Sequence, residues 1–277
     1  MNAALPPRDL LLSRLLELSQ QDGGKPCVCV RSVHAHQIKS VEIDRPTLIL
    51  PLRGTKRVRE HENWVQVVPG EGLLVPGARH VDMENIPESP AEPYEAVAIG
   101  LEAHVLASAR QLLADVQFPA PGPLVQVPLD SLCDALFSWL DHTLRGDKVL
   151  ACHAMTGVVL RLHALGYGGL LAATAPTLAQ RIRDMVLADP SRDWSSPDLE
   201  AALGMSGATL RRQLAAAGTS LRDIIASARL AQALTLLIST RLPVKSVAQR
   251  VGYASAASFS KRFTERYGVE PSRVSSA

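Results

Sequence analysis

The chain has 277 residues, of which 47% are hydrophobic and 20% are charged, and its formal net charge is +2. This composition excludes an intrinsically disordered chain, and the length favours two domains over one. The charge is uneven, because residues 1–175 hold 15 Lys or Arg against 19 Asp or Glu, whereas residues 176–277 hold 14 against 8. A basic excess gathered in one part of a chain is typical of a module that binds nucleic-acid phosphates.

The amino-terminal residues and the cysteines indicate the cytoplasm. The first residues lack the basic start of a signal peptide, and Arg14 and Glu17 interrupt the leucine-rich stretch Leu10–Leu18, which predicts an amphipathic surface helix. The four cysteines form no CxxC pair and no secreted disulfide framework. No apolar run reaches the about 18 residues needed to cross a bilayer. We therefore expect a cytoplasmic protein without a membrane partner.

Residues 26–100 have the pattern of short β-strands. Apolar runs such as Thr47–Leu52 and Leu73–Val75 alternate with turn signals, among them Pro69–Gly72 and the pair Pro76 and Gly77. Strands at this spacing predict a small barrel or sandwich.

From about residue 102 the apolar residues fall at helical intervals. Leucine-rich helices are predicted between residues 129 and 144 and between 149 and 165. We expect this pair to form a self-association surface; the alternative is that both helices only pack on the barrel. Residues 171–177 are predicted to be a linker, which separates a first domain, residues 1–170, from a second, residues 178–277.

The last hundred residues contain one motif twice: a short amphipathic helix, a Gly-centred turn and a second short helix with basic and hydroxyl side chains. The first copy spans Asp198–Leu214 with its turn at Gly204, and the second spans Val244–Phe263 with its turn at Gly252. This pattern indicates a helix-turn-helix, which holds its second helix in the major groove of DNA. Two copies predict that the chain reads two groove segments about one helical turn apart.

A longer helix is predicted between the two copies, from Leu221 to Ser239, with Thr219 or Ser220 as its N-cap. Its apolar residues form one stripe, which would fix the orientation of the two halves. The helix that opens the first copy is expected to start at Ser196 as N-cap, followed by Pro197.

The second helix of the first copy is predicted to begin after the N-cap Ser206 and to bury Leu210 and Leu214. The residues left facing outward are Gly207, Ala208, Arg211 and Arg212. Arginine can bond bidentately to guanine, a contact worth roughly 1–3 kcal/mol of base discrimination. We expect at least one of the two arginines to contact a base; the alternative is that both touch phosphates or stay solvated.

The second helix of the second copy is predicted to begin after the N-cap Ser255 and to bury Phe259 and Phe263. Its exposed face is small and polar and comprises Ala256, Ala257, Ser258, Ser260, Lys261 and Arg262. We expect this face to discriminate bases less sharply, with its two cations contacting phosphates or purines. The alternative is a charged face that is only solvated.

These residues resemble the AraC/XylS family of bacterial transcription regulators. The resemblance covers residues of about 178–273 and is most specific at Val251–Tyr253, at Phe259 and Ser260, and at Gly268–Pro271. It implies an α+β chain in which a cupin-like β-barrel with flanking dimerisation helices precedes an all-α domain with two helix-turn-helix subdomains joined by a long helix. These subdomains would contact successive major grooves on one face of promoter DNA.

The resemblance also implies a role for each domain. The protein would be a regulator, and we expect an activator, with RNA polymerase as a further candidate partner. The first domain would sense a small molecule, form a homodimer, or both. The sequence departs from the family at Glu200, where an alanine is usual, and after Pro271, where an aromatic-Arg ending is missing. We expect the first departure to shift the packing of the first copy.

Three basic residues flank Gly54 and are expected near the rim of the barrel: Arg53, Lys56 and Arg57. A cationic rim would suit an effector with a carboxylate. The alternative is a solvated hairpin tip.

A metal-dependent cupin enzyme with an accessory DNA-binding domain is the alternative class. Its candidate ligands are His34, His36, Glu42, and His61 or His80. The His-x-His pair would put both imidazoles on one strand face, a sound ligand geometry. However, the glycine and the nearby glutamate that usually flank this pair are missing, and Cys27 and Cys29 would point away on an unbroken strand. We therefore expect no metal, no cofactor and no catalysis.

Overall fold

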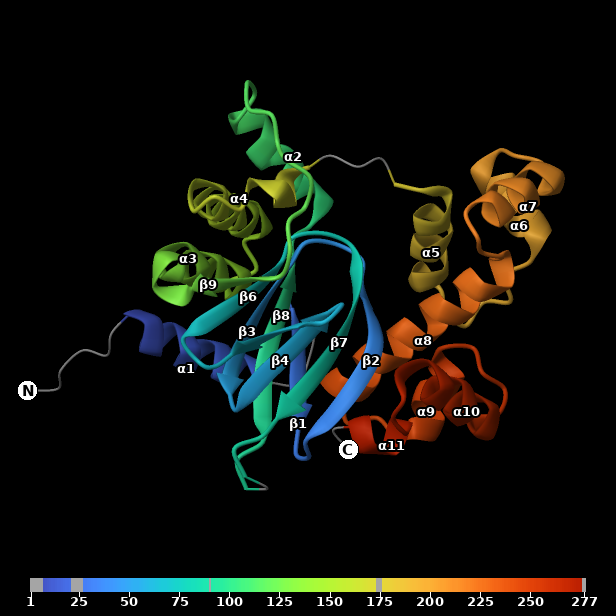
Figure 1. Ribbon diagram of the computed structural model, residues 1–277, viewed down its shortest axis with the longest axis horizontal. Helices are drawn as coiled ribbons and strands as arrows, with labels where there is room; N and C mark the ends of the chain where they lie inside the picture. The colour runs from blue at the N-terminus through green and yellow to red at the C-terminus, as the bar shows by residue number, and fades with distance from the viewer. Residues whose placement is uncertain (1–6, 21–26, 90, 173–175, 276–277) are drawn as a thin grey trace, which may run out of the picture. The chain divides into compact units, whose positions relative to one another are not determined.

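The computed structural model describes residues 7–20, 27–89, 91–172 and 176–275. The chain divides into two compact units, an amino-terminal unit of residues 1–173 and a carboxyl-terminal unit of residues 174–277 (Figure 1). The first is α+β and the second is helical, as the sequence predicted. Part of the predicted linker, residues 173–175, lies outside the described residues. No helix in the described ranges is long and apolar enough to span a bilayer.

The described strands of the amino-terminal unit form two antiparallel sheets. The larger sheet has the order β1 (Val28–Ser32), β8 (Tyr94–Gly100), β3 (Thr47–Arg53), β6 (Glu71–Val75) and β9 (Val125–Pro128). The smaller sheet has the order β2 (His36–Ile43), β7 (Arg79–Ile86), β4 (Thr55–Glu60) and β5 (Asn63–Val67). The two hydrogen-bonded ladders stay separate in the described residues, so the predicted strands are confirmed but the closed barrel is not.

Helices cover one face of the larger sheet. The helix α1 (Pro7–Gln20) buries Leu11, Leu15 and Leu18 in the same core as Leu48 and Leu50 of β3. This spacing confirms the amphipathic helix predicted there. Residues of the strand β3 are buried on both faces, which explains its unbroken apolar run.

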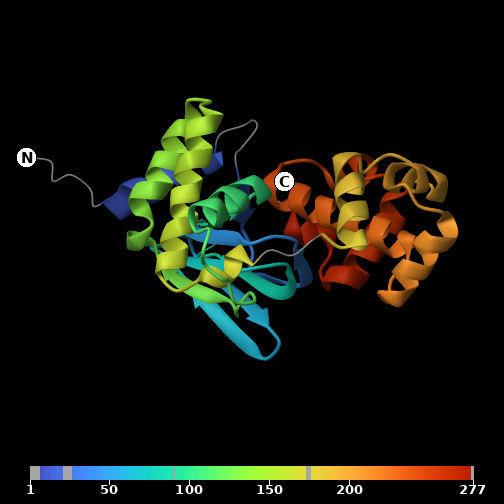
Figure 2. The ribbon, with the colours of Figure 1, turned by 90° about the horizontal axis from the view of Figure 1, so that it is seen from above.

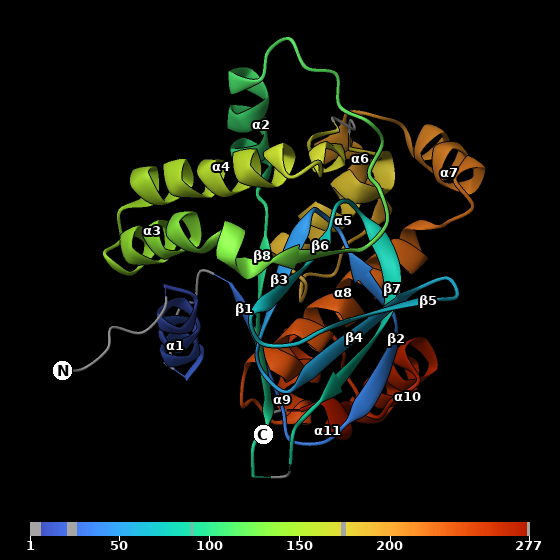
Figure 3. The same ribbon diagram turned by 60° about the vertical axis from the view of Figure 1, so that its left-hand side comes forward.

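The leucine-rich pair forms the helices α3 (Cys133–Leu144) and α4 (Lys148–Ala164), which lie side by side (Figure 2 and Figure 3). A further helix, α2 (Ala103–Leu112), packs against α4. Most of the leucines of α3 and α4 belong to the core of the unit itself. Apolar side chains remain exposed at the turn between the two helices: Leu144, Val149 and Leu150. This turn is therefore the part of the pair that is open to another molecule.

The helices of the two motif copies and the helix between them fall where the sequence predicted them, and a further helix lies on each side. They are α5 (Leu178–Ala188), α6 (Ser196–Leu203), α7 (Gly207–Ala216), α8 (Leu221–Ser239), α9 (Val244–Arg250), α10 (Ala256–Tyr267) and α11 (Pro271–Val274). The N-cap of α8 is Ser220, whose Oγ accepts a hydrogen bond from the Asp223 amide at 3.2 Å. The N-cap of α6 is Ser195 and not Ser196, because Ser195 Oγ accepts from the Asp198 amide and Ser196 is already helical.

The long helix α8 connects two small cores. Near its start, Ile224 and Ala228 join a core that includes Leu199, Leu210 and Leu214 from α6 and α7. Further along, α8 packs against α9 and α11, and α9 packs against α10. The predicted apolar stripe thus serves as the common support of both helix-turn-helix copies.

Candidate nucleic-acid interface

The first helix-turn-helix consists of α6 and α7. Gly204 ends α6 with φ +66°, a left-handed conformation that favours glycine. The Ser206 hydroxyl then caps α7 by accepting a hydrogen bond from the Thr209 amide at 3.3 Å. Leu210 and Leu214 are 1% and 2% exposed, which confirms the predicted buried side of α7.

The opposite face of α7 is open. Ala208, Arg211 and Arg212 are exposed, as predicted, and so is the capping residue Ser206. Neither arginine forms an ion pair with another residue in the described part of the chain. Both guanidinium groups are therefore available to a partner.

Gly207 is buried, so the prediction that it faces outward is wrong. A Cβ at this position would lie 2.8 Å from the carboxyl carbon of Glu200 on α6, and the Ser196 hydroxyl donates to the same carboxylate at 2.8 Å. The structure thus accommodates the departure at Glu200 by the absence of a side chain at residue 207. The sequence contains both residues, but the burial of Gly207 can be predicted only when Glu200 of one helix is considered together with Gly207 of the next.

The second helix-turn-helix consists of α9 and α10. Gly252 has φ +82°, and a Cβ there would lie 2.8 Å from both the guanidinium carbon of Arg229 and the Pro190 carbonyl oxygen. The Ser255 hydroxyl caps α10 by accepting from the Ser258 amide at 3.4 Å. Phe259 and Phe263 are fully buried, with ring centroids 5.6 Å apart, which confirms the predicted buried side of α10.

The predicted outer face of α10 is more closely packed than that of α7. Ala257, Ser258, Lys261 and the cap Ser255 are exposed, whereas Ala256, Ser260 and Arg262 are half-buried. Lys261 Nζ lies 4.0 Å from Glu265 Oε1, with both side chains largely exposed, so this pair contributes little. Lys261 therefore remains available to a phosphate.

Arg229, in the middle of α8, connects the two copies. Its Nε donates to the Pro190 carbonyl at 2.9 Å, and its two Nη atoms donate to the carbonyls of Arg192, at 2.9 Å, and Gly252, at 3.4 Å. Sequence reasoning assigned this residue no role. The signal for it was a cation placed within an otherwise apolar stretch of the linking helix.

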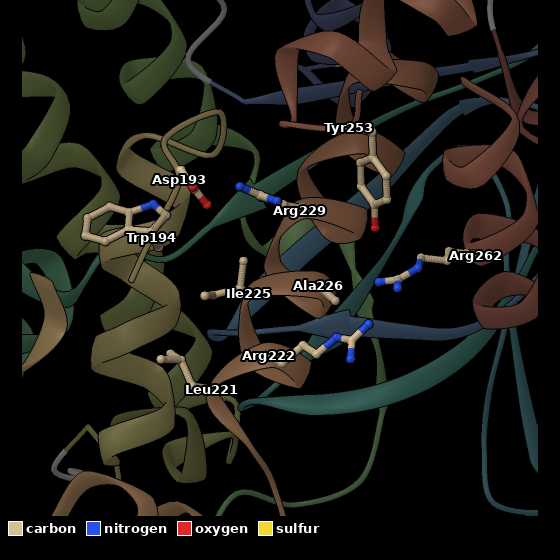
Figure 4. A pocket seen from close by; sticks show the side chains of 9 residues that line it. All are labelled: Asp193, Trp194, Leu221, Arg222, Ile225, Ala226, Arg229, Tyr253 and Arg262. Carbon is tan, nitrogen blue, oxygen red and sulfur yellow. The ribbon is translucent and has the colours of Figure 1, made fainter. Parts of the chain in front are cut away.

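A hollow of about 430 Å³ lies between the two copies (Figure 4). It is lined by Asp193, Trp194, Leu221, Arg222, Ile225, Ala226, Arg229, Tyr253 and Arg262. Burial raises the pKa of the Tyr253 hydroxyl, an effect that the positive charges of Arg262 and Arg229 oppose. Three of the nine lining residues are arginines and one is an aspartate, so the hollow carries an excess of positive charge.

In the amino-terminal unit, the structure separates the three basic residues expected at a rim. Arg53 Nη1 lies 3.5 Å from Glu95 Oε2, and Arg57 Nη1 lies 2.8 Å from Glu84 Oε2. Lys56 is 3% exposed; it donates to Asn85 Oδ1 at 2.7 Å, and burial lowers its pKa to about 7. The prediction that Lys56 lies on a rim is therefore wrong, because this residue points into the unit.

The candidate metal ligands are not brought together. His34 is exposed in the loop between β1 and β2, whereas His36 is buried in β2, so the two imidazoles do not share a strand face as expected. His80 Nε2 lies 3.8 Å from Glu42 Oε2, and His61 is exposed in the turn after β4. Within the described ranges, no three His, Cys, Asp or Glu side chains are arranged to hold a metal ion.

Residues 199–277 match a family model described as a helix-turn-helix domain. Three curated relatives are similar to the carboxyl-terminal part of the chain. An uncharacterised HTH-type transcriptional regulator of Mycobacterium tuberculosis is 37% identical over 94 residues, which are 34% of this chain and 27% of the relative. The transcriptional activator FapR of Escherichia coli is 29% identical over 104 residues, 38% and 40% of the two chains. The urease operon transcriptional activator of Escherichia coli is 31% identical over 94 residues, 34% and 32%.

The matched segment thus spans about a quarter to two fifths of the length of these relatives, all of which are transcription regulators.

Solved structures of ToxT from Vibrio cholerae resemble most of the chain. A ligand-free form with one substitution has a TM-score of 0.62 at 14% identity and covers 91% of this chain and 97% of its own. A form with a bound unsaturated fatty acid has a TM-score of 0.61 at 16% identity, covering 93% and 98%. At these identities the likeness is one of fold.

Proposed function

We propose that this chain, whose carboxyl-terminal unit belongs to the AraC family of helix-turn-helix proteins, is a sequence-specific regulator of transcription that binds promoter DNA. The observation that carries the proposal is the construction of α7 and α10. Each helix is capped by a serine and anchored by a buried i and i+4 pair, which leaves a cationic outer face. Curated relatives include transcriptional activators, so we propose activation, with RNA polymerase as a further candidate partner.

In this proposal the two reading helices have different roles. Arg211 and Arg212 on α7 contact base edges, where arginine selects guanine. The face of α10 from Ser258 to Arg262 adds phosphate and purine contacts. A site of roughly 17–20 base pairs per protomer is expected for two groove contacts one turn apart.

Selection of bound duplexes from a random DNA pool tests the proposal. The full chain should enrich one motif with two conserved blocks about one helical turn apart. An Arg241→Ala variant, changed at an exposed arginine outside both reading helices, should enrich the same motif and serves as control. Recovery of unselected sequence, or of a motif with a single block, would contradict the proposal.

We further propose that the amino-terminal unit, as the counterpart of a cupin-like sensing domain, binds an acidic small molecule at Lys56. The partners of its ammonium group are both neutral, the amide oxygen of Asn85 and, at 3.0 Å, the sulfur of Met83. Its Nζ lies 5.9 Å from the centroid of the Tyr94 ring. The buried Tyr94 hydroxyl has no hydrogen-bond partner among the described residues. A carboxylate placed here would accept from both groups. The fatty acid bound to ToxT has the same chemistry.

Thermal-shift measurements with carboxylic acids and their matched amides test this site. An acid that binds should raise the melting temperature of the full chain, and its amide should not. Because the pKa of Lys56 is about 7 in the free protein, a bound carboxylate would raise it. The affinity should then fall as the pH rises from 7 to 9, by at most tenfold per unit.

Lys56→Met should abolish this response, whereas Arg57→Ala, changed at a surface ion pair, should retain it. An equal response in the Lys56→Met variant would contradict the site. The DNA-binding proposal would be untouched by that result.

We also propose a homodimer formed through the turn between α3 and α4. The side chains of Leu144, Val149 and Leu150 are 45%, 78% and 43% exposed, a cluster typical of a surface that another protein covers. Sedimentation of the full chain should give a dimer that the double variant Val149→Asp and Leu150→Asp converts to monomer. A wild-type monomer at every concentration would contradict this.

A further inference from the structure

We propose that the hollow between the two helix-turn-helix copies binds phosphates of the DNA backbone, with Arg222 and Arg262 as the cationic donors. The inference rests on the proposed function and adds a contact surface that is built mainly on α8 and includes Arg262 of the reading helix α10. The floor of the hollow is α8, one wall is the segment at Trp194 before α6, and the other wall is Tyr253 with Arg262 (Figure 4).

The side chains of Arg222, Tyr253 and Arg262 converge on one side of the hollow. In Figure 4 both guanidinium groups and the tyrosine hydroxyl point toward a common region. Neither Arg222 nor Arg262 forms an ion pair with a described residue. A planar guanidinium group with free N–H donors matches a phosphate in a bidentate geometry.

Arg229 also lines the hollow, but its role is different. Its Nε and both Nη atoms donate to main-chain carbonyls on the two walls. These contacts hold the walls at a fixed separation, so Arg229 is a positioning residue and the other two arginines are the binding residues.

The geometry of DNA provides the ligand. When two reading helices occupy successive major grooves on one face of a duplex, the stretch between them presents the minor groove with the phosphates of both strands. The hollow lies along α8, the helix that joins the two copies, between the segment that precedes α6 and the helix α10. Arg262 belongs to α10 itself, so the same helix contributes to the groove contact and to the hollow.

The test measures binding of the full chain to its selected duplex as a function of salt. Arg222→Gln should weaken binding about tenfold and should weaken the selected and a scrambled duplex equally. The slope of log affinity against log salt should become less steep by about 0.9 for each phosphate released. Tyr253→Phe, which removes only the hydroxyl, should weaken binding by a smaller factor with little effect on the slope.

A neutral methylphosphonate placed in the backbone between the two conserved blocks sharpens the test. Wild-type protein should lose affinity for this duplex, and Arg222→Gln should lose little more, because the two changes remove the same contact. Arg241→Gln should bind both duplexes like wild type. All variants are compared at equal helicity and melting temperature, which keeps a folding defect apart from a lost contact.

Two outcomes would overturn the inference. One is that Arg222→Gln binds the duplex with the affinity and salt slope of the wild type, which would leave the hollow without a DNA contact. The other is that inorganic phosphate stabilises the wild type but not Arg222→Gln while the two proteins bind DNA with equal affinity, which would assign the hollow to a free anion. In both cases an intact selected motif would leave the proposed function standing, whereas failure to select any motif would contradict that function itself.

Discussion

The two helix-turn-helix copies are built by the same plan on cores of different chemistry. The second helix of the first copy rests on aliphatic residues, with Leu210 and Leu214 packed among side chains of α5, α6 and α8. That of the second copy rests on rings, since Phe259, Phe263 and Tyr267 follow one another with centroids 5.6 Å and 4.7 Å apart. The outer faces differ as well: α7 presents two neighbouring arginines, and α10 presents small hydroxyl residues and Lys261. The same helix-turn-helix scaffold therefore carries two outer faces of different chemistry.

The largest expected effect is on the free energy of unfolding, which should fall by different amounts when each of the two cores is truncated. Phe263→Ala should lower the free energy of unfolding by about 3–5 kcal/mol, and Leu214→Ala by about 2–5 kcal/mol. The aromatic variant should lose more, because it also removes ring contacts worth about 0.5–1.5 kcal/mol each. Urea denaturation of the full chain measures both. Equal losses would mean that the ring series adds nothing beyond its buried area.

The next effect concerns the two reading surfaces. Arg211→Ala should relax the preference at one or two base pairs, a change of about 1–3 kcal/mol in discrimination. Lys261→Ala should weaken selected and scrambled duplexes by the same factor and reduce the salt slope by about 1. Competition binding with single-base variants of the motif measures both. If the Lys261→Ala variant changed base preference and the Arg211→Ala variant did not, the assignment of the two surfaces would be reversed.

A smaller effect tests the contact between Glu200 of α6 and Gly207 of α7. Gly207→Ala alone should change stability little, since the gain in helix propensity is offset by displacement of the Glu200 carboxylate from Ser196. In a Glu200→Ala background the same substitution should stabilise by about 0.5–1 kcal/mol. A double-mutant cycle measures this difference, and perfect additivity would show that the two residues do not share space.

The smallest effect is a difference in acid sensitivity. Hydrogen bonds from the Ser195 hydroxyl and amide, with Arg192 nearby, hold the pKa of Asp198 below its usual range. Its contribution to α6 is therefore present above about pH 4 and is lost as the pH falls through the depressed pKa. The corresponding helix of the second copy, α9, has Pro243 as its N-cap and no side-chain cap, so it has no such contribution. The melting temperatures of wild type and Asp198→Asn should differ at pH 6 and converge toward pH 3; a constant difference would contradict this origin.

Local signals account for what could be predicted from the sequence. The bounds of α8 follow from a capping serine, Ser220, and an uninterrupted apolar stripe, both of which act over a few residues. The buried pairs of α7 and α10 follow from their spacing of four. The inward position of Lys56 was also readable, because it alternates with Arg57 and lies on the same strand face as Val58, which is fully buried.

The remaining features depend on parts of the chain that are far apart in sequence. The burial of Gly207 is set by a carboxylate seven residues earlier on another helix. Whether the strands close into a barrel or form two sheets depends on which edge strands pair, and the apolar alternation is the same in both cases. The hollow collects residues from three segments between Asp193 and Arg262, so no single motif contains it.

The hydrogen bonds of Arg229 have a consequence for the operator. This side chain donates hydrogen bonds to carbonyls beside both copies, and these bonds hold the two reading helices at a fixed spacing. A bound duplex must therefore present its two conserved blocks at that spacing. Adding about five base pairs between the conserved blocks rotates one of them by half a turn. Such a spacer should abolish one of the two groove contacts, because two copies held at a fixed spacing cannot follow the displaced block around the DNA helix.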